Sequence, residues 1–237
     1  MMKIEKTRFL SFCEAILALA PECRVWLKKE GIEVRVVDTA NVAMVSAKLP
    51  KDAFGEYNEE SGILGLDLPR LKAVTGLMKT GLLEIEQDEK GKLRITDGTT
   101  RYSTGLLDVN TIRKDPNPPD ITLSATIAIG AKELQESITA MSKIGDKIRF
   151  SLQGKTLTLT TEGDTDSLVK EIEGDMVKSL KEPVASLFST DYLKEIGRVI
   201  KDAEKVEVSM STNHPIRIVC VVDGIELVYL VAPRIEE

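Results

Sequence analysis

Apolar residues recur along this chain with two different periods. In Ile32–Asp38 they occupy every second position, which is typical of a half-buried strand. In Thr190–Ala203 they recur every three or four residues, which places Leu193, Ile196 and Ile200 on one face of a helix. Runs of the first kind greatly outnumber those of the second, and most are joined by turn residues. The pattern therefore predicts an α+β fold of antiparallel hairpins with two helices in each half of the chain.

The predicted elements follow the same order in both halves: strand, helix, four strands, helix and three strands. In the first half the strands are Met2–Lys6, Arg24–Lys28, Ile32–Asp38, Val42–Lys48, an extended piece within Phe54–Leu66, Leu82–Gln87, Lys92–Asp97 and Thr100–Leu106, and the helices are Phe9–Ala20 and Leu68–Lys79. In the second half the strands are Ser124–Ile129, Lys147–Leu152, Thr156–Thr161, Ser167–Glu173, Val184–Ser189, Lys205–Ser211, Ile216–Val222 and Ile225–Val231, and the helices are Ala131–Lys143 and Thr190–Ala203. The first helix is expected to bury a face made of Leu10, Cys13, Ile16, Leu17 and Ala20.

Matched positions show that the two halves keep register. The hairpin glycines Gly31 and Gly154 lie 123 residues apart, and the helical leucines Leu71 and Leu193 lie 122 residues apart. A nearly constant offset between two copies of one element order indicates an internal duplication. We therefore expect an N-terminal domain of residues 1–107, a connecting loop of residues 108–121 and a C-terminal domain of residues 122–237.

The connecting loop, Asp108–Ile121, contains Pro116, Pro118 and Pro119. Proline cannot continue a helix or donate to a central strand ladder, and it restricts the residue before it. We expect this loop to be extended and stiff. A stiff loop loses little conformational entropy when a partner docks against it.

Composition excludes several classes of protein. The chain of 26.1 kDa has 42% hydrophobic and 30% charged residues, as in ordinary globular proteins. No apolar run approaches the roughly 20 residues of a membrane span, and the N-terminus lacks a signal peptide, so an intracellular protein is expected. The three cysteines, at positions 13, 23 and 220, are interpreted as buried reduced thiols. With His214 as the only histidine, a zinc site or a catalytic Ser/His or Cys/His pair is not expected.

The predicted helices are net positive, although the whole chain carries a charge of −6. Lys194, Arg198 and Lys201 follow one another at i, i+4 and i+7, opposite the apolar face of their helix. Lys72 and Lys79 are expected to stack in the same way on the second helix. These positions have two interpretations: ordinary solvated helix faces, or a surface for a polyanion. The second gains weight because basic faces recur in both halves.

Several stretches resemble one known family, the sliding clamps of the proliferating cell nuclear antigen (PCNA) type in their archaeal form. They are Tyr-Leu-Val-Ala-Pro-Arg-Ile-Glu-Glu (229–237), Val-Asp-Thr-Ala-Asn-Val-Ala-Met-Val (37–45), Met-Ser-Lys-Ile-Gly-Asp (141–146) and the proline-bearing loop. The resemblance covers the whole chain in order. It implies a homotrimeric ring of six similar processivity-fold domains, with antiparallel sheets outside and two helices per domain on the inner face.

The resemblance also implies a function, a DNA polymerase processivity factor that encircles duplex DNA without reading its sequence. Its implied partners are double-stranded DNA, two further copies of the chain, and enzymes that bind through short peptide motifs: DNA polymerase, the clamp loader, flap endonuclease and DNA ligase. It implies no catalytic residue, cofactor, metal or membrane contact, and a place in the cytoplasm at the nucleoid of an archaeal cell.

Three sets of residues carry the implied roles. The DNA-facing set is Lys72, Lys79, Lys132, Lys143, Lys194, Arg198 and Lys201; the client-peptide set is Val42, Met44, Ile112, Leu230, Val231, Ala232 and Pro233; the subunit-contact set is Arg101, Tyr102, Thr104, Leu168, Lys170 and Glu171. For the client set, an ordinary core role is the alternative. The subunit set lies on edge strands that we expect to pair head to tail.

The chain departs from the family at two helices. The first helix offers Leu10, Ser11, Glu14 and Leu17 where the family usually brings lysines to the DNA, and Glu136 and Thr139 stand where arginines are common. We therefore predict weak, strongly salt-sensitive DNA contact. Two other functions stay open: one subunit of a heteromeric or checkpoint-type clamp, and a hydrolase that uses carboxylates such as Asp38 and Asp67. The sequence argues against the hydrolase, because it offers no histidine as a general base and no recognisable hydrolase motif.

Overall fold

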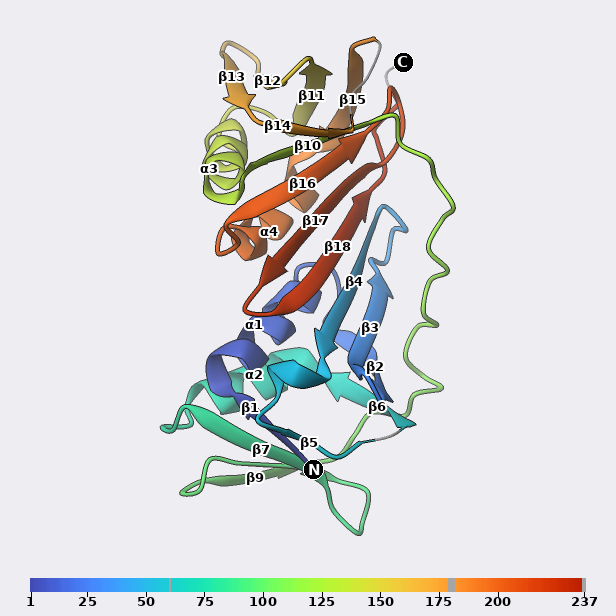
Figure 1. Ribbon diagram of the computed structural model, residues 1–237, viewed down its shortest axis with the longest axis vertical. Coiled ribbons are helices and arrows are strands. Elements are labelled where there is room, and N and C mark those ends of the chain that lie inside the picture. The colour runs from blue at the N-terminus through green and yellow to red at the C-terminus, as the bar shows by residue number, and fades with distance from the viewer. Residues whose placement is uncertain (60, 179–181, 236–237) are drawn as a thin grey trace. The chain divides into compact units, whose positions relative to one another are not determined.

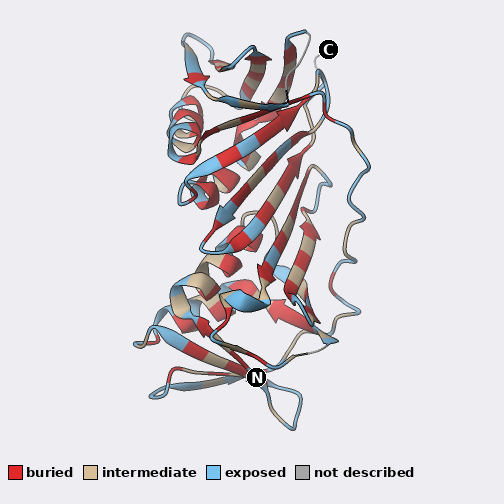
Figure 2. Cartoon of the chain, viewed as in Figure 1, coloured by how far each residue is buried: buried red, intermediate tan, exposed pale blue. Residues whose placement is uncertain are grey.

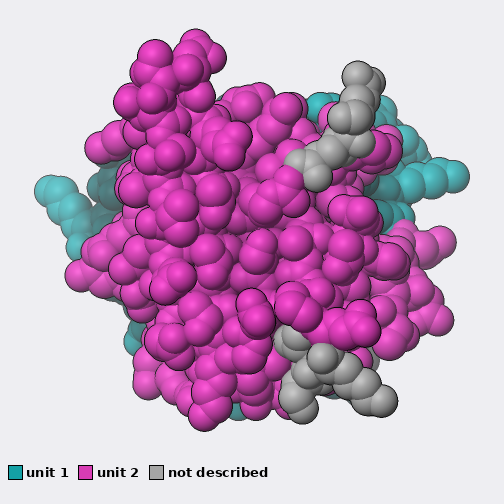
Figure 3. Space-filling view, turned by 90° about the horizontal axis from the view of Figure 1, so that it is seen from above, with its two compact units in different colours: residues 1–39, 45–116, 223–226 teal, residues 40–44, 117–222, 227–237 magenta. Residues whose placement is uncertain are grey.

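The computed structural model describes residues 1–59, 61–178 and 182–235 (Figure 1). They form two compact units, which Figure 3 colours separately. Unit 1 comprises residues 1–39, 45–116 and 223–226, and unit 2 comprises residues 40–44, 117–222 and 227–237. The first part of the predicted connecting loop, through Pro116, therefore belongs to unit 1.

In its described residues, unit 1 contains two α-helices, one short 3-10 turn and two sets of strands. One sheet has the order β5-β1-β7-β8-β9, and a second set has the order β4-β3-β2-β6. The strands are β1 (Met2–Glu5), β2 (Glu22–Lys28), β3 (Gly31–Val37), β4 (Ala43–Pro50), β5 (Glu56–Tyr57), β6 (Ser61–Asp67), β7 (Leu82–Gln87), β8 (Leu93–Thr96) and β9 (Arg101–Thr104); the helices are α1 (Lys6–Leu17), α2 (Leu68–Gly76) and the short 3-10 turn η1 (Lys51–Ala53). The first two residues of β4 are counted with unit 2.

Unit 2 repeats this arrangement. Its strand orders are β14-β10-β16-β17-β18 and β13-β12-β11-β15. The strands are β10 (Ala125–Gly130), β11 (Lys147–Gln153), β12 (Thr156–Glu162), β13 (Ser167–Glu173), β14 (Asp175–Lys178), β15 (Val184–Ser189), β16 (Lys205–Met210), β17 (Ile216–Val222) and β18 (Ile225–Val231); the helices are α3 (Ala131–Met141) and α4 (Thr190–Ile200). In each unit the two helices pack against each other, α1 on α2 and α3 on α4.

The two strand orders match element for element, which confirms the α+β fold and the duplicated order of its elements. They also show a strand that the sequence pattern did not reveal in either half. β5 pairs with β1 in unit 1, and β14 pairs with β10 at the equivalent place in unit 2. β5 has only two residues, and β14 exposes three of its four side chains. Neither strand is long and alternating enough to give a periodic signal.

The first helix begins three residues earlier than predicted and buries a different face. α1 starts directly after β1, and the backbone N–H of Lys6 donates to the carbonyl of Gly81 (2.7 Å). Leu10, Leu17 and Ala20, predicted to be buried, are half-buried, and Ala20 lies beyond the helix, which ends at Leu17. The buried face consists of Phe9, Phe12, Cys13, Ala15 and Ile16. The two phenylalanines decide this orientation, because they have the most apolar area to remove from water.

α2 ends at Gly76, and so the prediction of a helix through Lys79 is wrong. The carboxylate of Asp97 accepts the backbone N–H groups of Lys79 (2.8 Å) and Thr80 (3.3 Å), which turns the chain out of the helix. Lys79 therefore lies beyond the helix and does not stack beneath Lys72.

Asp97 holds the β8–β9 turn as well. Its carboxylate also accepts the backbone N–H groups of Thr100 (2.7 Å) and Thr99 (3.0 Å) and the hydroxyl of Thr99 (3.0 Å). These hydrogen bonds, that of Thr100 first, hold the pKa of Asp97 far below its usual range. β9, which follows the turn, has four residues, fewer than the predicted Thr100–Leu106.

α3 and α4 also end before their predicted limits, at Met141 and Ile200. After α3 the N–H of Gly145 donates to the carbonyl of Met141 (3.1 Å), which closes the helix with a tight turn. A side chain at Gly145 would come within 2.5 Å of the Glu162 carbonyl oxygen, so this turn requires glycine. Lys143 lies in the turn and not on the helix.

The core of each unit lies between its strand sets and its helices, as the alternation of buried and exposed residues along the strands shows (Figure 2). In unit 2, Phe150 and Phe188 meet edge to face with centroids 5.6 Å apart. The three cysteines are buried and reduced, as expected, and burial raises the pKa of Cys13 and Cys220 to about 12. None of the helices in the described residues combines the length and apolarity needed to cross a membrane.

Candidate functional site

The seven cations of the DNA-facing set fall into two groups. Three of them are paired with acids nearby: Lys72 with Glu14 (2.9 Å), Lys132 with Glu136 (3.9 Å) and Arg198 with Glu195 (2.6 Å). The other four have no ion-pair partner within the described part of the chain: Lys79, Lys143, Lys194 and Lys201. The pairing of Lys72 reduces the charge that it presents. The unpaired lysines sit on α4 and at helix ends.

α4 provides the clearest cationic face. Its buried residues include Leu193, Ile196 and Ile200, as predicted, and Lys194 and Arg198 are exposed on the other side. Lys201 caps the helix C-terminus, where a positive charge is favoured by the helix dipole. A helix of this kind presents charge to solvent without burying any, and so it suits contact with phosphates and not with base edges.

The subunit-contact set lies on two strand edges. β9 is hydrogen-bonded to β8, and β13 to β12; in the described residues neither has a neighbour on its other side. On β9, Arg101 is exposed, Tyr102 is half-buried and Thr104 is buried; on β13, Leu168 is half-buried, and Lys170 and Glu171 are exposed. β13 also exposes Val169, whose side chain the sequence reasoning did not single out.

A groove of about 250 Å³ runs between β13 and α3 in unit 2. It is lined by Glu133, Glu136, Ser137, Ala140, Leu168, Val169 and Lys170. Lys170 pairs with Glu133 (3.3 Å) across its rim. In unit 1, α2 is followed by an exposed apolar residue, Leu77, whose relative exposure is 83%. The periodic pattern of apolar residues could not indicate Leu77. Such a pattern detects side chains that are buried in regular elements, whereas Leu77 is exposed and lies just after a helix.

Most of the client-peptide set is buried. In unit 2, Met44, Leu230 and Val231 are core residues, and Val42, Ala232 and Pro233 are half-buried. The backbone N–H of Ala232 donates to the Val42 carbonyl (2.8 Å), which brings these two predicted residues together. The surface available to a peptide in unit 2 is therefore the half-buried part of the set.

Ile112, the seventh member, belongs to unit 1 and borders a pocket of about 180 Å³ there. Apolar atoms make up most of its wall. The lining residues are Leu19, Ala20, Pro21, Glu22, Val36, Val37, Thr39, Ile112, Arg113 and Lys114. The sequence did not indicate Val36 and Val37 as pocket residues: both belong to a predicted alternating strand, and Val37 also begins the stretch 37–45 that resembles the family.

Hydrogen bonds within unit 1 hold Leu107, directly before the connecting loop, and the first part of the loop itself. The N–H of Leu107 donates to the carbonyl of Gly65 (2.9 Å), and Arg24 donates to the carbonyl of Ile112 (2.7 Å). Further along, the guanidinium of Arg113 donates to the carbonyl of Asp38 (2.6 Å), and the indole N–H of Trp26 donates to the carboxylate of Asp115. The contacts come from β2, β6 and the end of β3, so the loop lies along one face of this strand set.

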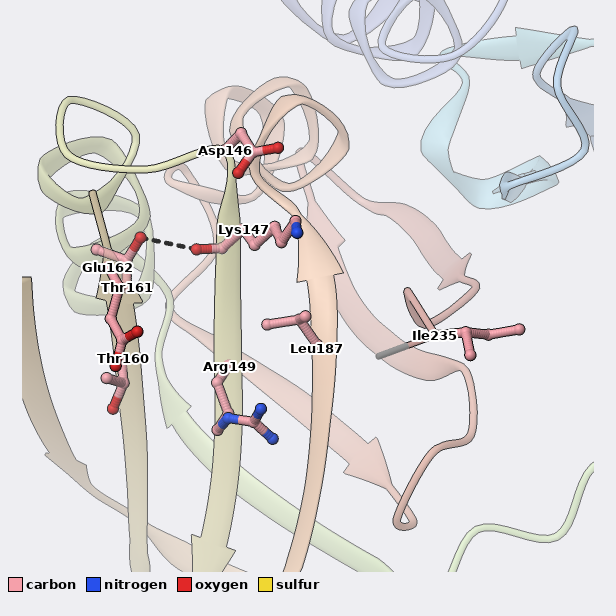
Figure 4. A pocket seen from close by; sticks show the side chains of 8 residues that line it. All are labelled: Asp146, Lys147, Arg149, Thr160, Thr161, Glu162, Leu187 and Ile235. Carbon is pink, nitrogen blue, oxygen red and sulfur yellow. Dashed lines mark hydrogen bonds between the residues drawn. The ribbon is translucent and has the colours of Figure 1, made fainter. Parts of the chain in front are cut away.

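A larger, polar cavity of about 630 Å³ lies in unit 2 (Figure 4). Its lining comes from β11, β12, β15 and the C-terminal segment: Asp146, Lys147, Arg149, Thr160, Thr161, Glu162, Leu187 and Ile235. The hydroxyl of Thr161 donates to the Lys147 carbonyl (2.7 Å). Arg234 holds the C-terminal segment at the rim, since its N–H donates to Leu187 (2.7 Å) and its guanidinium pairs with Asp146 (3.6 Å).

The two aspartates considered for a hydrolase both make hydrogen bonds that stabilise the fold, Asp67 through its carboxylate and Asp38 through its backbone carbonyl. The side chain of Asp67 caps α2 by accepting the N–H of Arg70 (3.1 Å), and Asp38 uses its carbonyl to hold Arg113. Among the residues that the structure describes, no three His, Cys, Asp or Glu side chains gather as a metal site would require.

In both sequence and fold, this chain is similar to known proteins of one family. Residues 117–234 match the family model described as proliferating cell nuclear antigen, C-terminal domain. The DNA polymerase sliding clamp of Methanoculleus marisnigri is 43% identical over 98% of this chain and 97% of its own. The Archaeoglobus fulgidus PCNA, solved with the C-terminal region of FEN-1 bound, superposes with a TM-score of 0.92 at 32% identity, covering 100% of this chain and 98% of that one. PCNA from Thermococcus kodakaraensis shares the fold, with a TM-score of 0.88 at 23% identity over 98% of this chain and 99% of that one.

Proposed function

Since this chain belongs to the PCNA family of DNA polymerase sliding clamps, we propose that three copies close into a ring around duplex DNA and tether replication and repair enzymes to it. Tethering makes and breaks no covalent bond, so the proposal assigns no catalytic residue or cofactor. We also propose that residues 1–107 and 122–237 are the two domains of the chain, with the connecting loop of residues 108–121 between them.

The observation that carries the proposal is the pair of unpaired edges, one in each of two repeated units. An exposed strand edge offers a row of free N–H and C=O groups to another strand. Because β9 belongs to unit 1 and β13 to unit 2, pairing them between copies is head to tail and repeats until rotation closes a ring. Arg101, Tyr102, Thr104, Leu168, Lys170 and Glu171 are the subunit contacts in this scheme.

Side chains beside these edges are complementary. The groove next to β13 contains two acids, Glu133 and Glu136, and one base, Lys170, whereas α2 and the turn after it carry Arg70, Lys72 and Lys79 and no acid. Leu77 lies at the same end of unit 1 as the β8–β9 turn, because Asp97 joins that turn to Lys79. We propose that Leu77 of one copy fills the groove of the next, which would remove a large apolar side chain from water.

The DNA contact that we propose is electrostatic and weak. Lys194, Arg198 and Lys201 on α4 form its centre, supported by Lys72, Lys79, Lys132 and Lys143. Two of the three paired cations have a carboxylate close by, Lys72 at 2.9 Å and Arg198 at 2.6 Å, so a phosphate must compete with that carboxylate for them. A lining that neutralises phosphates without reaching base edges allows the ring to slide.

We propose that clients bind at two surfaces, one in each unit: the half-buried residues Val42, Ala232 and Pro233 in unit 2, and the pocket at Ile112 in unit 1. The relative from Archaeoglobus fulgidus was solved with the C-terminal region of FEN-1 bound. We therefore propose that this chain takes short peptide ends of a flap endonuclease, a DNA polymerase, a DNA ligase and the clamp loader. A few apolar anchors would supply most of the affinity.

Retention on DNA of defined topology tests the proposal. The chain is loaded onto nicked circular duplex DNA, and the DNA is then linearised. A sliding ring stays on the circle at moderate salt and leaves the linear molecule through its ends. Equal retention on both forms would refute encirclement.

The mass in solution separates the homotrimer from a subunit of a heteromeric clamp. Light scattering of the purified chain should give about 78 kDa, three times 26.1 kDa. A stable monomer would favour the heteromeric alternative, since such a subunit needs different partners to close the ring.

A further inference from the structure

The connecting loop is not held uniformly. Its first part, through Asp115, is joined to unit 1 by side-chain hydrogen bonds, whereas residues 117–120 are exposed. The three prolines begin only at Pro116. Proline stiffness therefore cannot fix the part of the loop that contains Ile112.

We propose that Arg24 and Trp26 are positioning residues that hold the connecting loop as a preformed wall of the client site. The inference rests on the proposed binding of client peptides. Neither residue needs to touch the peptide. Arg24 donates to the carbonyl of Ile112 (2.7 Å), and Trp26 donates to the carboxylate of Asp115, so the two side chains secure the loop on either side of Arg113 and Lys114.

Burial makes the Arg24 contact important. Its Nε atom is buried and has no hydrogen-bond partner in the described part of the chain, so the guanidinium is already partly desolvated. The contact with the Ile112 carbonyl offsets some of this cost, because a charged donor that is removed from water needs an acceptor. The Ile112 side chain is itself only 5% exposed, so the contact keeps it seated.

The loop forms one side of the unit 1 pocket. Ile112, Arg113 and Lys114 close a space of about 180 Å³ whose other side includes Val36 and Val37. If the loop detached, the pocket would lose that side, and a peptide would have to order the loop again on binding. The free energy spent on ordering the loop lowers the affinity. The apparent affinity equals the intrinsic affinity multiplied by the fraction of molecules in which the site is already formed.

The size of the effect follows from one hydrogen bond. Loss of a hydrogen bond to a charged group shifts a local equilibrium by roughly tenfold or more. If the loop is attached in about 90% of molecules of the unaltered protein, a shift of about a hundredfold leaves it attached in about 10% of them, and apparent affinity falls about ninefold. We expect Trp26→Phe and Arg24→Met each to weaken peptide binding about fivefold to tenfold.

The experiment uses the full-length protein and a synthetic peptide of the C-terminal region of a flap endonuclease, with affinity measured by calorimetry. Trp26→Phe keeps an aromatic ring and removes the N–H donor. Arg24→Met keeps the length of the stem and removes the guanidinium. Arg35→Met is the control for loss of a positive charge, since Arg35 contacts Glu33 at 4.0 Å and, among the described residues, makes no hydrogen bond or ion pair with the loop.

Hydrogen exchange of residues 109–115 without peptide provides the readout that a general loss of stability would not reproduce. We expect both variants to accelerate exchange in this segment, with the thermal midpoint and exchange elsewhere unchanged. A double-mutant cycle adds a second criterion: Asp115→Ala should weaken binding in the unaltered protein and have little further effect in Trp26→Phe.

Three results would overturn the inference. Unchanged exchange in both variants would show that the side chains do not hold the loop. Faster exchange with unchanged affinity would show that clients do not need a preformed loop. The unaltered protein could also fail to bind the peptide while hydrogen exchange is still faster in the variants. In that case the proposed client binding is wrong, and Arg24 and Trp26 have no positioning role in it.

Discussion

Gly65 is the point at which a single methyl group should disturb both the fold and the client site. It lies on β6, and a Cβ atom added there would lie 2.3 Å from the Leu107 carbonyl oxygen and 2.9 Å from Cδ1 of Ile112. Real Cβ atoms do not come this close to backbone oxygen. Gly65→Ala must therefore push the start of the connecting loop away from β6 and unseat Ile112.

The free energy of unfolding changes through three contributions. Overpacking against backbone costs about 1–3 kcal/mol. Weakening the Leu107 hydrogen bond to the Gly65 carbonyl costs about 1 kcal/mol more. Replacing a strand glycine returns about 0.5–1 kcal/mol, because alanine loses less conformational freedom on folding. We expect Gly65→Ala to lower the free energy of unfolding by roughly 1–3 kcal/mol.

Gly62→Ala on the same strand is the matched control. The nearest atom to its added Cβ would be Cδ1 of Leu27 at 3.2 Å, the end of a side chain that can move. Urea unfolding at a fixed protein concentration compares the two variants, because the proposed ring assembly would make stability depend on concentration. Hydrogen exchange at Leu107 and the affinity for the peptide show whether the loop has moved away from β6. If Gly65→Ala is as stable as Gly62→Ala and keeps Leu107 protected, the added methyl group does not push the chain at Leu107 away from β6, and the prediction is wrong.

Three further predictions follow from the surfaces. Val169→Asp on the β13 edge should dissociate the trimer to a species near 26.1 kDa in light scattering, whereas Val221→Asp, equally exposed at 57%, should leave it assembled; assembly of both variants would remove β13 from the interface. Lys194→Ala combined with Lys201→Ala should shorten retention on circular DNA and reduce the slope of log affinity against log salt; an unchanged slope would place the phosphates elsewhere. Asp97→Asn should destabilise the protein most at neutral pH: because folding lowers the pKa of Asp97, its stabilisation is present above 3.8 and is lost as pH falls below that value. A difference from the unaltered protein that grows toward acid pH would contradict this assignment.

The buried members of the client set change how that site should be tested. Leu230→Ser with Val231→Ser is expected, on the sequence alone, to abolish peptide binding and leave the ring intact. The structure places Val231 at 0% and Leu230 at 9% exposure on β18. Removing such side chains costs about 2–5 kcal/mol each, so loss of binding would not distinguish a lost anchor from a damaged unit. Substitutions at Ala232 and Pro233 avoid this problem.

Periodicity and duplication by themselves determined much of this protein. The alternation in strands such as Ile225–Val231 and the helical spacing in Thr190–Ile200 were correct because each reflects burial of one face of a regular element. The constant offset between Gly31 and Gly154 indicated two copies of one fold. Resemblance in four stretches then indicated the family, which the comparisons confirmed.

Only the tertiary structure decided which side chains are available at the surface. Lys72 and Lys79 have helical spacing in the sequence, but α2 ends before Lys79 because a carboxylate 18 residues later takes its backbone N–H. Arg24 and Trp26 alternate with buried residues on a strand, and nothing near them in sequence shows that a loop almost 90 residues later lies across them. Local propensity determines an element from residues that are close in the chain, whereas helix ends, strand edges and loop attachments depend on hydrogen bonds between residues that folding alone brings together.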